Sequence, residues 1–360
     1  MVCLTQFFQQ MKNSNMQLTS FDNAFYEERL KDFLPTRIVD LHAHIWQKSF
    51  EIPRLNLERG AQWASKVASE NSIEELLADY SILLPGQQVT PLLFGWPERY
   101  IDVGANNCWV SVQAKQYHLP TLFVSKPDIP PEELEAQVMK GGFLGLKPYL
   151  EFAPVHLTAD QISIFDFLPK AHLEVANAYH WIVMLHLPRS GRLHDPENLT
   201  QMLEIERNYP NIQLVIAHLG RAYCMQDIGN ALEILRHTDC MLFEFSANTN
   251  SEVMLQFIRV FGSKRLVFGS DMPITRMRMR RICENGTYVN LVPPNLYGEL
   301  HNEPHMREIS LADAEQLTFF LYEELLAFGR AAELSGLTGT DMENIFYNNA
   351  QRLFQNLTEG

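Results

Sequence analysis

The chain has 360 residues, of which 46% are hydrophobic and 20% are charged, and this ordinary globular composition excludes a largely disordered protein. Its formal net charge of -14 argues against partners that are nucleic acids or anionic membranes. No stretch approaches the ~20 apolar residues that span a bilayer, and the first residues lack the pattern of an export signal. We therefore expect a folded cytoplasmic protein.

The cysteines are scattered along the chain as Cys3, Cys108, Cys224, Cys240 and Cys283. Their number is odd, and no two of them form a C-x-x-C pair. This pattern favours reduced thiols over a disulfide framework. A reducing compartment is the simplest environment for such a chain.

Short apolar runs rich in Val, Ile, Leu and Phe recur from the first third of the chain onward. They predict eight strands, at residues 38–44, 90–95, 121–125, 143–150, 181–187, 212–220, 240–247 and 265–271. Most are separated by segments whose apolar residues return every three or four positions, as in helices. Alternating strands and helices predict parallel βα units. Eight such units predict an α/β fold of the closed (β/α)8 TIM-barrel type, with an open doubly wound sheet as the alternative.

The remaining residues exceed the about 250 that such a barrel usually takes. We interpret residues 1–37 as an N-terminal extension and residues 38–360 as one barrel domain with elaborated loops. Within that domain, the weakly periodic segment 272–310 reads as a long loop. Extra C-terminal helices are expected at residues 311–335 and 341–355.

Polar side chains stand near the ends of several predicted strands, where barrels of this type carry their chemistry. In the first strand, His42 and His44 are two residues apart and so share one face. The full set of candidates is His42, His44, Lys147, His186, His218 and Asp271. Each alone has a structural explanation, but burying all of them without partners would cost several kcal/mol. A divalent cation would satisfy them, and three imidazoles with a carboxylate suit Zn2+ or another first-row metal that activates a water.

Four stretches together resemble the amidohydrolase superfamily, in the branch called amidohydrolase family 2. They are H-x-H on the first strand, VMLHLPRSGRLHDPENL, VIAHLGRAY and LVFGSDMP. The resemblance implies that His42, His44, His186 and Asp271 bind the metal. It further implies that Asp271 handles the proton of the attacking water. His218 would be a ligand in a two-metal site, and a general base or electrostatic partner in a one-metal site.

Lys147 leaves the number of metals open. In two-metal relatives a fourth-strand lysine is carboxylated and bridges the ions, whereas family 2 members often carry G-x-K there with a single metal. We expect one metal per chain, most simply Zn2+, with two metals as the alternative. A purely structural role would pair Lys147 with Glu151 or Glu244.

Candidate substrate contacts follow the strand ends. Arg189 and Arg221 each lie three residues after a strand-end histidine, where a guanidinium fork would bind a carboxylate. Trp46 and Trp96 would wall an apolar or aromatic pocket. The alternatives are solvent-exposed loop arginines and tryptophans that only pack. The arginines at positions 276, 278, 280 and 281 are interpreted mainly as a solvated face that could also reach the mouth of the barrel.

The sequence therefore predicts a metal-dependent hydrolase in which an activated water attacks a small carbonyl substrate that can bear a carboxylate. Asp271 and His218 would move protons. A nonoxidative decarboxylase of an aromatic or unsaturated acid is the alternative in the same family. A barrel that keeps its metal without catalysis is the third hypothesis. Substrate identity and oligomeric state stay open, a homo-oligomer included.

Overall fold

The structure, a computed structural model, describes residues 17–53, 63–301 and 303–356. Among these residues, eight parallel strands follow one another along the chain with helices between most of them. They are β1 (Arg37–His44), β2 (Gln88–Phe94), β3 (Phe123–Ser125), β4 (Gly145–Pro148), β5 (Ile182–Leu185), β6 (Gln213–Ile216), β7 (Leu242–Glu244) and β8 (Leu266–Val267). Each predicted run overlaps one of these strands. Regularly spaced apolar runs were thus enough to place the sheet.

The strands form a β1–β2 pair and a six-stranded sheet in the order β3 to β8. Backbone hydrogen bonds join these two parts at both edges. Between β2 and β3, the Leu93 amide donates to the Pro120 carbonyl over 2.9 Å. Between β1 and β8, the Leu41 amide donates to the Phe268 carbonyl over 3.1 Å, and the His44 amide donates to Met272 over 2.8 Å. The predicted TIM barrel is confirmed.

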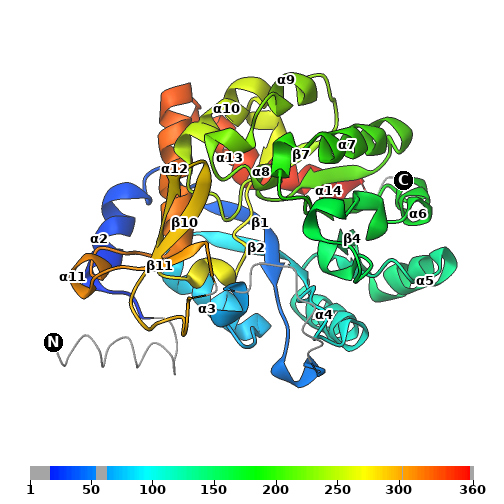
Figure 1. Cartoon of the computed structure of the whole chain (residues 1–360), viewed down its shortest axis with the longest axis horizontal. Helices are drawn as coiled ribbons and strands as arrows, with labels where there is room; N and C mark the ends of the chain where they lie inside the picture. The colour runs from blue at the N-terminus through cyan, green and yellow to red at the C-terminus, as the bar shows by residue number, and fades with distance from the viewer. Residues whose placement is uncertain (1–16, 54–62, 302, 357–360) are drawn as a thin grey trace.

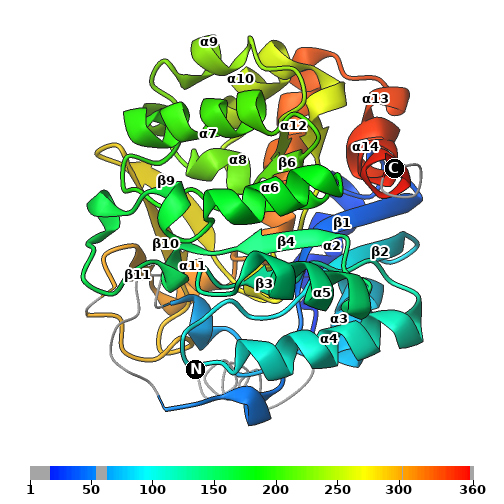
Figure 2. The ribbon, with the colours of Figure 1, turned by 90° about the vertical axis from the view of Figure 1, so that its right-hand side faces the viewer.

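Helices surround the strands in the views of Figures 1 and 2. In the described ranges they are α2 (Ser20–Arg29), α3 (Ile73–Leu83), α4 (Val103–Tyr117), α5 (Pro131–Gly141), α6 (Lys170–Ala178), α7 (Pro196–Asn208), α8 (His218–Arg221), α9 (Ala231–Leu235), α10 (Ser251–Phe261), α11 (Leu311–Ala314), α12 (Phe320–Ser335), α13 (Gly339–Glu343) and α14 (Asn349–Asn356). Local chemistry sets several of their starts. Ser72 and Glu75 form a capping box at α3, and Asp195 caps α7.

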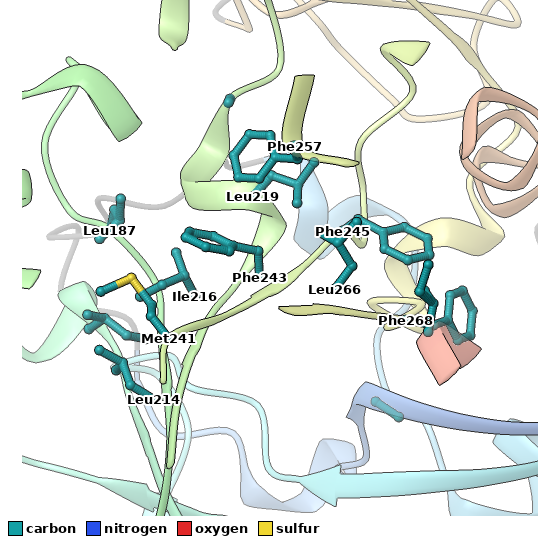
Figure 3. Packing of buried hydrophobic residues seen from close by; sticks show 14 of the residues in the cluster. Leu187, Leu214, Ile216, Leu219, Met241, Phe243, Phe245, Phe257, Leu266 and Phe268 are labelled. Atoms are coloured by element: carbon teal, nitrogen blue, oxygen red, sulfur yellow. The ribbon is translucent and has the colours of Figure 1, made fainter. Parts of the chain in front are cut away.

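Strand alternation separates the apolar layer from the polar centre. Phe243 on β7 points toward Phe257 of α10 in Figure 3, with the ring centroids 5.2 Å apart. Phe245, two residues on, packs against Phe268 at 5.7 Å. Glu244 lies between them in sequence and therefore faces the opposite side, the barrel interior. The apolar layer holds the strand rigidly while it presents a carboxylate inward.

The structure corrects the long loop that we expected at residues 272–310. This segment contains a small three-stranded sheet. Strands β9 (Arg280–Glu284) and β10 (Thr287–Val292) pair antiparallel, and β11 (Met306–Glu308) adds to β10 in parallel. Asn285 and Gly286 connect β9 to β10 with positive φ angles of 52° and 79°. Asn-Gly is a strong signal for a two-residue hairpin turn, and the sequence interpretation overlooked it. Figure 2 shows this sheet on the side of the barrel opposite α13 and α14.

The cysteine interpretation also needs correction. Cys224, which follows α8, forms a disulfide with Cys283 of β9 across 59 positions of sequence. Cys108 and Cys240 are free and exposed. Folding of the β9–β10 hairpin over the segment after β6 brings the pair together, which spacing alone could not reveal. Because two of the cysteines form a disulfide, the cysteine pattern no longer supports a reducing compartment.

The described part of the N-terminal extension packs on the barrel through α2. Asp22 is fully buried and pairs with Arg278, whose Nη2 lies 2.7 Å from its carboxylate. Thr318 donates a further hydrogen bond to Asp22 over 2.8 Å. This network ties α2 to the segment that follows β8. None of the described helices combines the length and the apolarity needed to cross a membrane.

Candidate active site

The strand-end residues predicted from the sequence converge at one mouth of the barrel. The rings of His42 and His44 are 5.3 Å apart, and those of His42 and His218 are 4.8 Å apart. The His186 ring lies 5.3 Å from that of His218. One carboxylate oxygen of Asp271 is 3.5 Å from Nε2 of His42 and 3.4 Å from Nε2 of His44. Five side chains from four strand ends therefore line one cavity, and His186 belongs to neither of the two groups of donor atoms that lie close enough to share an ion.

Three of the imidazoles are oriented through their Nδ1 atoms. Nδ1 of His42 lies 3.1 Å from a Glu244 carboxylate oxygen, and Nδ1 of His44 lies 3.2 Å from the Gly95 carbonyl. Nδ1 of His218 lies 2.8 Å from Oγ of Ser246. A carboxylate or carbonyl acceptor fixes the proton on Nδ1 and leaves the Nε2 lone pair free to bind a metal. Burial, with the nearby Lys147 cation, lowers the pKa of His42 well below its usual range and keeps the ring neutral.

His186 differs, because its buried Nδ1 has no hydrogen-bond partner among the described residues. Its ring lies 5.0 Å from that of Tyr149. Burial, then the positive charge of Arg221, lowers the pKa of His186 well below its usual range. A neutral, buried imidazole nitrogen without a partner costs free energy, and a bound metal would remove that cost.

The donor set fits a divalent metal. Donor atoms of His42, His44 and Asp271 lie within 4.8 Å of one another, as do those of His42, His218 and Glu244. Since Glu244 contacts the Nδ1 of His42, we interpret it as the outer partner of a metal-binding histidine and the first trio as the centre. Imidazole nitrogens with a carboxylate oxygen are ligands that Zn2+ and related first-row ions accept.

Lys147 is fully buried beside this centre, with Nζ 3.4 Å from Nε2 of His42 and 5.0 Å from the centre of the Phe94 ring. Burial lowers the pKa of Lys147 to about 8. The expected alternative partner Glu151 lies instead 3.4 Å from Nε of Arg99. An amine with this pKa is partly neutral near physiological pH and can act as a base or be modified.

Asp271 is positioned by its neighbours in sequence. Asp40 of β1 is buried and accepts the Ser270 amide over 2.8 Å and the Tyr80 hydroxyl over 2.5 Å. At Gly269 an added Cβ would lie 2.5 Å from Glu244 and 2.8 Å from His42, so only glycine fits there. Asp271 itself has a φ of 57°, in the left-handed region. Burial alone would raise the pKa of Asp271, but the adjacent histidines lower it, and the carboxylate stays ionised.

A cavity of about 190 Å³ opens over these side chains. Besides the candidate ligands, its lining includes aromatic and cationic residues: Trp63, Trp96, Tyr149, Arg221, Tyr223, Arg281 and Tyr288. Nη1 of Arg221 donates to the carbonyls of Leu187, Pro188 and Arg189, at 3.0 to 3.1 Å. The volume lies below the about 300 Å³ at which drug-sized pockets begin, so the cavity suits one small molecule.

Two predicted substrate contacts, Arg189 and Trp46, are not among the residues that line this cavity. Nε of Arg189 lies 2.9 Å from the Asp195 carboxylate. Trp46 stacks on Trp96 with centroids 4.7 Å apart and donates from its indole to the Ser69 carbonyl. Trp96 therefore lines the cavity, and Trp46 packs against Trp96 without lining the cavity itself.

Several lining residues escaped the sequence interpretation. Tyr223 comes two residues after Arg221, and Tyr288 and Arg281 belong to the overlooked hairpin. The sequence interpretation named Arg281 only as one of four arginines that could reach the mouth of the barrel, and gave it no role of its own. Recognition of the Asn-Gly turn would have shown that neighbouring arginines on β9 face opposite sides.

Comparisons with known proteins agree with this geometry. The sequence profile of an amidohydrolase family matches residues 39–355. Similar solved structures include amidohydrolase 2 from Bifidobacterium longum subsp. infantis, at 16% identity and a TM-score of 0.52, covering 89% of this chain and 99% of that one. A probable 2-pyrone-4,6-dicarboxylic acid hydrolase from Acinetobacter baumannii, with citric acid bound, has 17% identity and a TM-score of 0.52, covering 88% and 99%.

A third similar structure is 2,6-dihydroxybenzoate decarboxylase from Rhizobium, at 15% identity and a TM-score of 0.50, covering 91% of this chain and all of that one, 100%. No curated protein matches the sequence. The structural similarities establish the fold, and the sequence profile establishes the family. This chain belongs to the amidohydrolase family 2, whose members are metal-dependent enzymes that include hydrolases and decarboxylases.

Proposed function

We propose that this protein is a metal-dependent hydrolase that adds water to a small carbonyl compound bearing a carboxylate. The observation that carries the proposal is the convergence of His42, His44 and Asp271, with two Nε2 atoms within 3.5 Å of one carboxylate oxygen. The aromatic walls and the cations of the adjoining cavity support a flat, anionic substrate. Such a substrate would place its reacting carbon over the ligand cluster.

His42, His44, His186 and Asp271 would hold the metal, most simply one Zn2+ ion. When bound, the metal would polarise the substrate carbonyl and make a water more acidic. The ionised Asp271 carboxylate would accept the proton of the attacking water.

His218 would complete the proton transfer. Burial lowers its pKa, so the ring is neutral and able to take up a proton. Its Nδ1 is held by Ser246, which directs Nε2 toward the centre. Trp63 and Trp96 would limit the access of bulk water to the reacting groups.

Decarboxylation is the second candidate, and the aromatic lining with two arginines favours it specifically. In that reaction Asp271 or His218 would first take up a proton from water and would then deliver it to the ring carbon that loses carbon dioxide. Lys147 lies beside His42 and would add positive charge close to the departing group. The two candidates therefore share residues and differ in the products.

The test is an assay of the purified, metal-loaded protein against lactones, esters, amides and hydroxybenzoates in 18O-labelled water. Hydrolysis predicts one 18O atom in the carboxylic acid product and no released carbon dioxide. Carbon dioxide release without 18O in the organic product would instead establish the decarboxylase. A stoichiometrically metal-loaded protein that turns over none of these substrate classes would contradict both candidates and support the non-catalytic barrel.

A further inference from the structure

One wall of the cavity carries a buried positive charge that forms no ion pair with a described carboxylate, although the charge of Asp271 acts on it electrostatically. Arg281 on β9 is 9% exposed and lines the cavity together with Asp271. Its Nε donates to the Asn290 side chain over 2.8 Å, and its Nη1 donates to the Ala247 carbonyl over 2.5 Å. Nη2 has no hydrogen-bond partner in the described ranges. The protein thus holds Nε and Nη1 of the guanidinium, and Nη2 stays available to bind a ligand.

Several other arginines are paired with a carboxylate, whereas Arg221, which also lines the cavity, donates to backbone carbonyls. Arg276 lies 2.9 Å from Asp79, Arg278 lies 2.7 Å from Asp22, and the more exposed Arg280 lies 3.2 Å from Glu323. Arg192, which also approaches the cavity tyrosines, lies 2.8 Å from Asp227. Among the described residues, none forms an ion pair with Arg281. A buried charge without a direct ion pair is costly, and an anionic ligand would reduce the cost.

Aromatic rings fix the plane of this guanidinium. The Arg281 carbon Cζ lies 4.6 Å from the centre of the Tyr223 ring, 4.4 Å from Tyr288 and 4.6 Å from Phe320. Stacking and the two donated hydrogen bonds leave the side chain little rotational freedom. A planar fork held in this way is prepared to bind a carboxylate with little further loss of entropy.

A covalent bond joins this wall to the barrel. The disulfide between Cys283, two residues after Arg281, and Cys224, next to Tyr223, connects β9 to the segment that also carries Arg221. Arg281 can therefore hold a fixed distance from the histidine cluster although it belongs to an insertion outside the barrel strands.

We propose that Arg281, presented by the β9–β10 hairpin, is the anchor for a non-reacting carboxylate of the substrate and selects small planar acids. This inference rests on the proposed function, because it takes the cavity as the substrate site. The carboxylate would sit at the hairpin wall, next to Nη2 of Arg281. The opposite end of the same molecule would then reach the histidine cluster, so the site would favour substrates with two functional groups.

The test uses the purified, metal-loaded protein and measures the dissociation constants of benzoate and of its neutral analogue benzamide by calorimetry. Arg281→Gln is expected to weaken benzoate binding about ten- to a hundredfold, because a charge-assisted hydrogen bond is lost, and to leave benzamide binding unchanged. Arg280→Gln, on the exposed face of the same strand, is the matched control and should bind both ligands as the unmodified protein does. Metal content is measured in every variant.

Arg281→Lys keeps the charge and loses the fork, so its benzoate affinity should fall between those of the unmodified protein and Arg281→Gln. It replaces Arg281→Gln if that variant does not fold. Equal losses for benzoate and benzamide, unchanged benzoate affinity, or no benzoate binding by the unmodified protein would each overturn the inference. Turnover without Arg281-dependent binding rejects this anchor alone, whereas Arg281-dependent binding without any turnover rejects the proposed reaction alone.

Discussion

The two walls of the cavity are built in different ways. On the barrel side, imidazoles stand at strand ends and take their orientation from acceptors on neighbouring strands, as His42 does from Glu244. On the hairpin side, Arg281 stands on an inserted strand and takes its orientation from tyrosine rings and a nearby disulfide. In our proposals, reaction chemistry and substrate choice therefore depend on separate parts of the chain. Changes at the strand ends should abolish turnover, and changes in the hairpin should alter which substrate binds.

The largest effect is expected from His42→Ala combined with His44→Ala. Because two of the proposed ligands are lost, we expect loss of the bound metal and a fall in kcat/KM of more than about a hundredfold, beyond what outer partners of metal ligands usually cost. Elemental analysis and steady-state kinetics measure both. His301→Ala, an exposed histidine, is the control. Loss of two metal equivalents would show a two-metal site and assign Lys147 a bridging role.

The second largest effect is expected from removal of the disulfide by Cys224→Ser combined with Cys283→Ser. It opens a link across 59 positions and should lower the free energy of unfolding by about 2–4 kcal/mol. Metal content should not change, because the strand ends are untouched. Urea unfolding measures the first quantity and elemental analysis the second. Cys108→Ser with Cys240→Ser, which replaces the free thiols of the described residues, should change neither quantity. Loss of metal from the disulfide variant would contradict the separation of the two walls.

Glu244→Gln is expected to have a smaller effect on the barrel wall than loss of the histidines. The amide keeps the shape of the side chain but weakens the orientation of His42, so metal affinity should fall about ten- to a hundredfold. Glu324→Gln is the matched control, since Glu324 is equally buried and binds only the Ala247 amide among the described residues. Competition with a metal chelator gives both affinities. Equal losses in the two variants would point to general disruption of the barrel.

The smallest effect is expected far from both walls, at the start of α13. Asp341 accepts hydrogen bonds from Ser263 and Thr338, which lower its pKa from 3.8 to about 2. Its contribution is therefore present above about pH 4 and is lost as the pH falls through 2. Asp341→Asn should cost about 1 kcal/mol of stability at pH 7 and less at pH 3, with no effect on activity. A cost in stability that grows toward pH 3 would contradict this assignment.

The residues of the barrel wall could be predicted from the sequence because the signals for them are local. Eight apolar runs and polar residues at their ends, such as H-A-H at 42–44, follow directly from strand alternation and barrel geometry. Glu244 stood in an apolar strand, but its pairing with His42 depends on barrel closure. The Cys224–Cys283 bond and the unpaired Arg281 depend on how an insertion folds back over the mouth. The Asn-Gly turn at 285–286 was the only local sequence signal for that insertion.

The most direct test of the account is a crystal structure of the metal-loaded protein with anomalous diffraction recorded at the absorption edge of the metal. The account predicts an anomalous peak about 2.0–2.2 Å from Nε2 of His42, Nε2 of His44 and a carboxylate oxygen of Asp271. A metal bound elsewhere in the molecule, or these three side chains turned away from a shared centre, would contradict it.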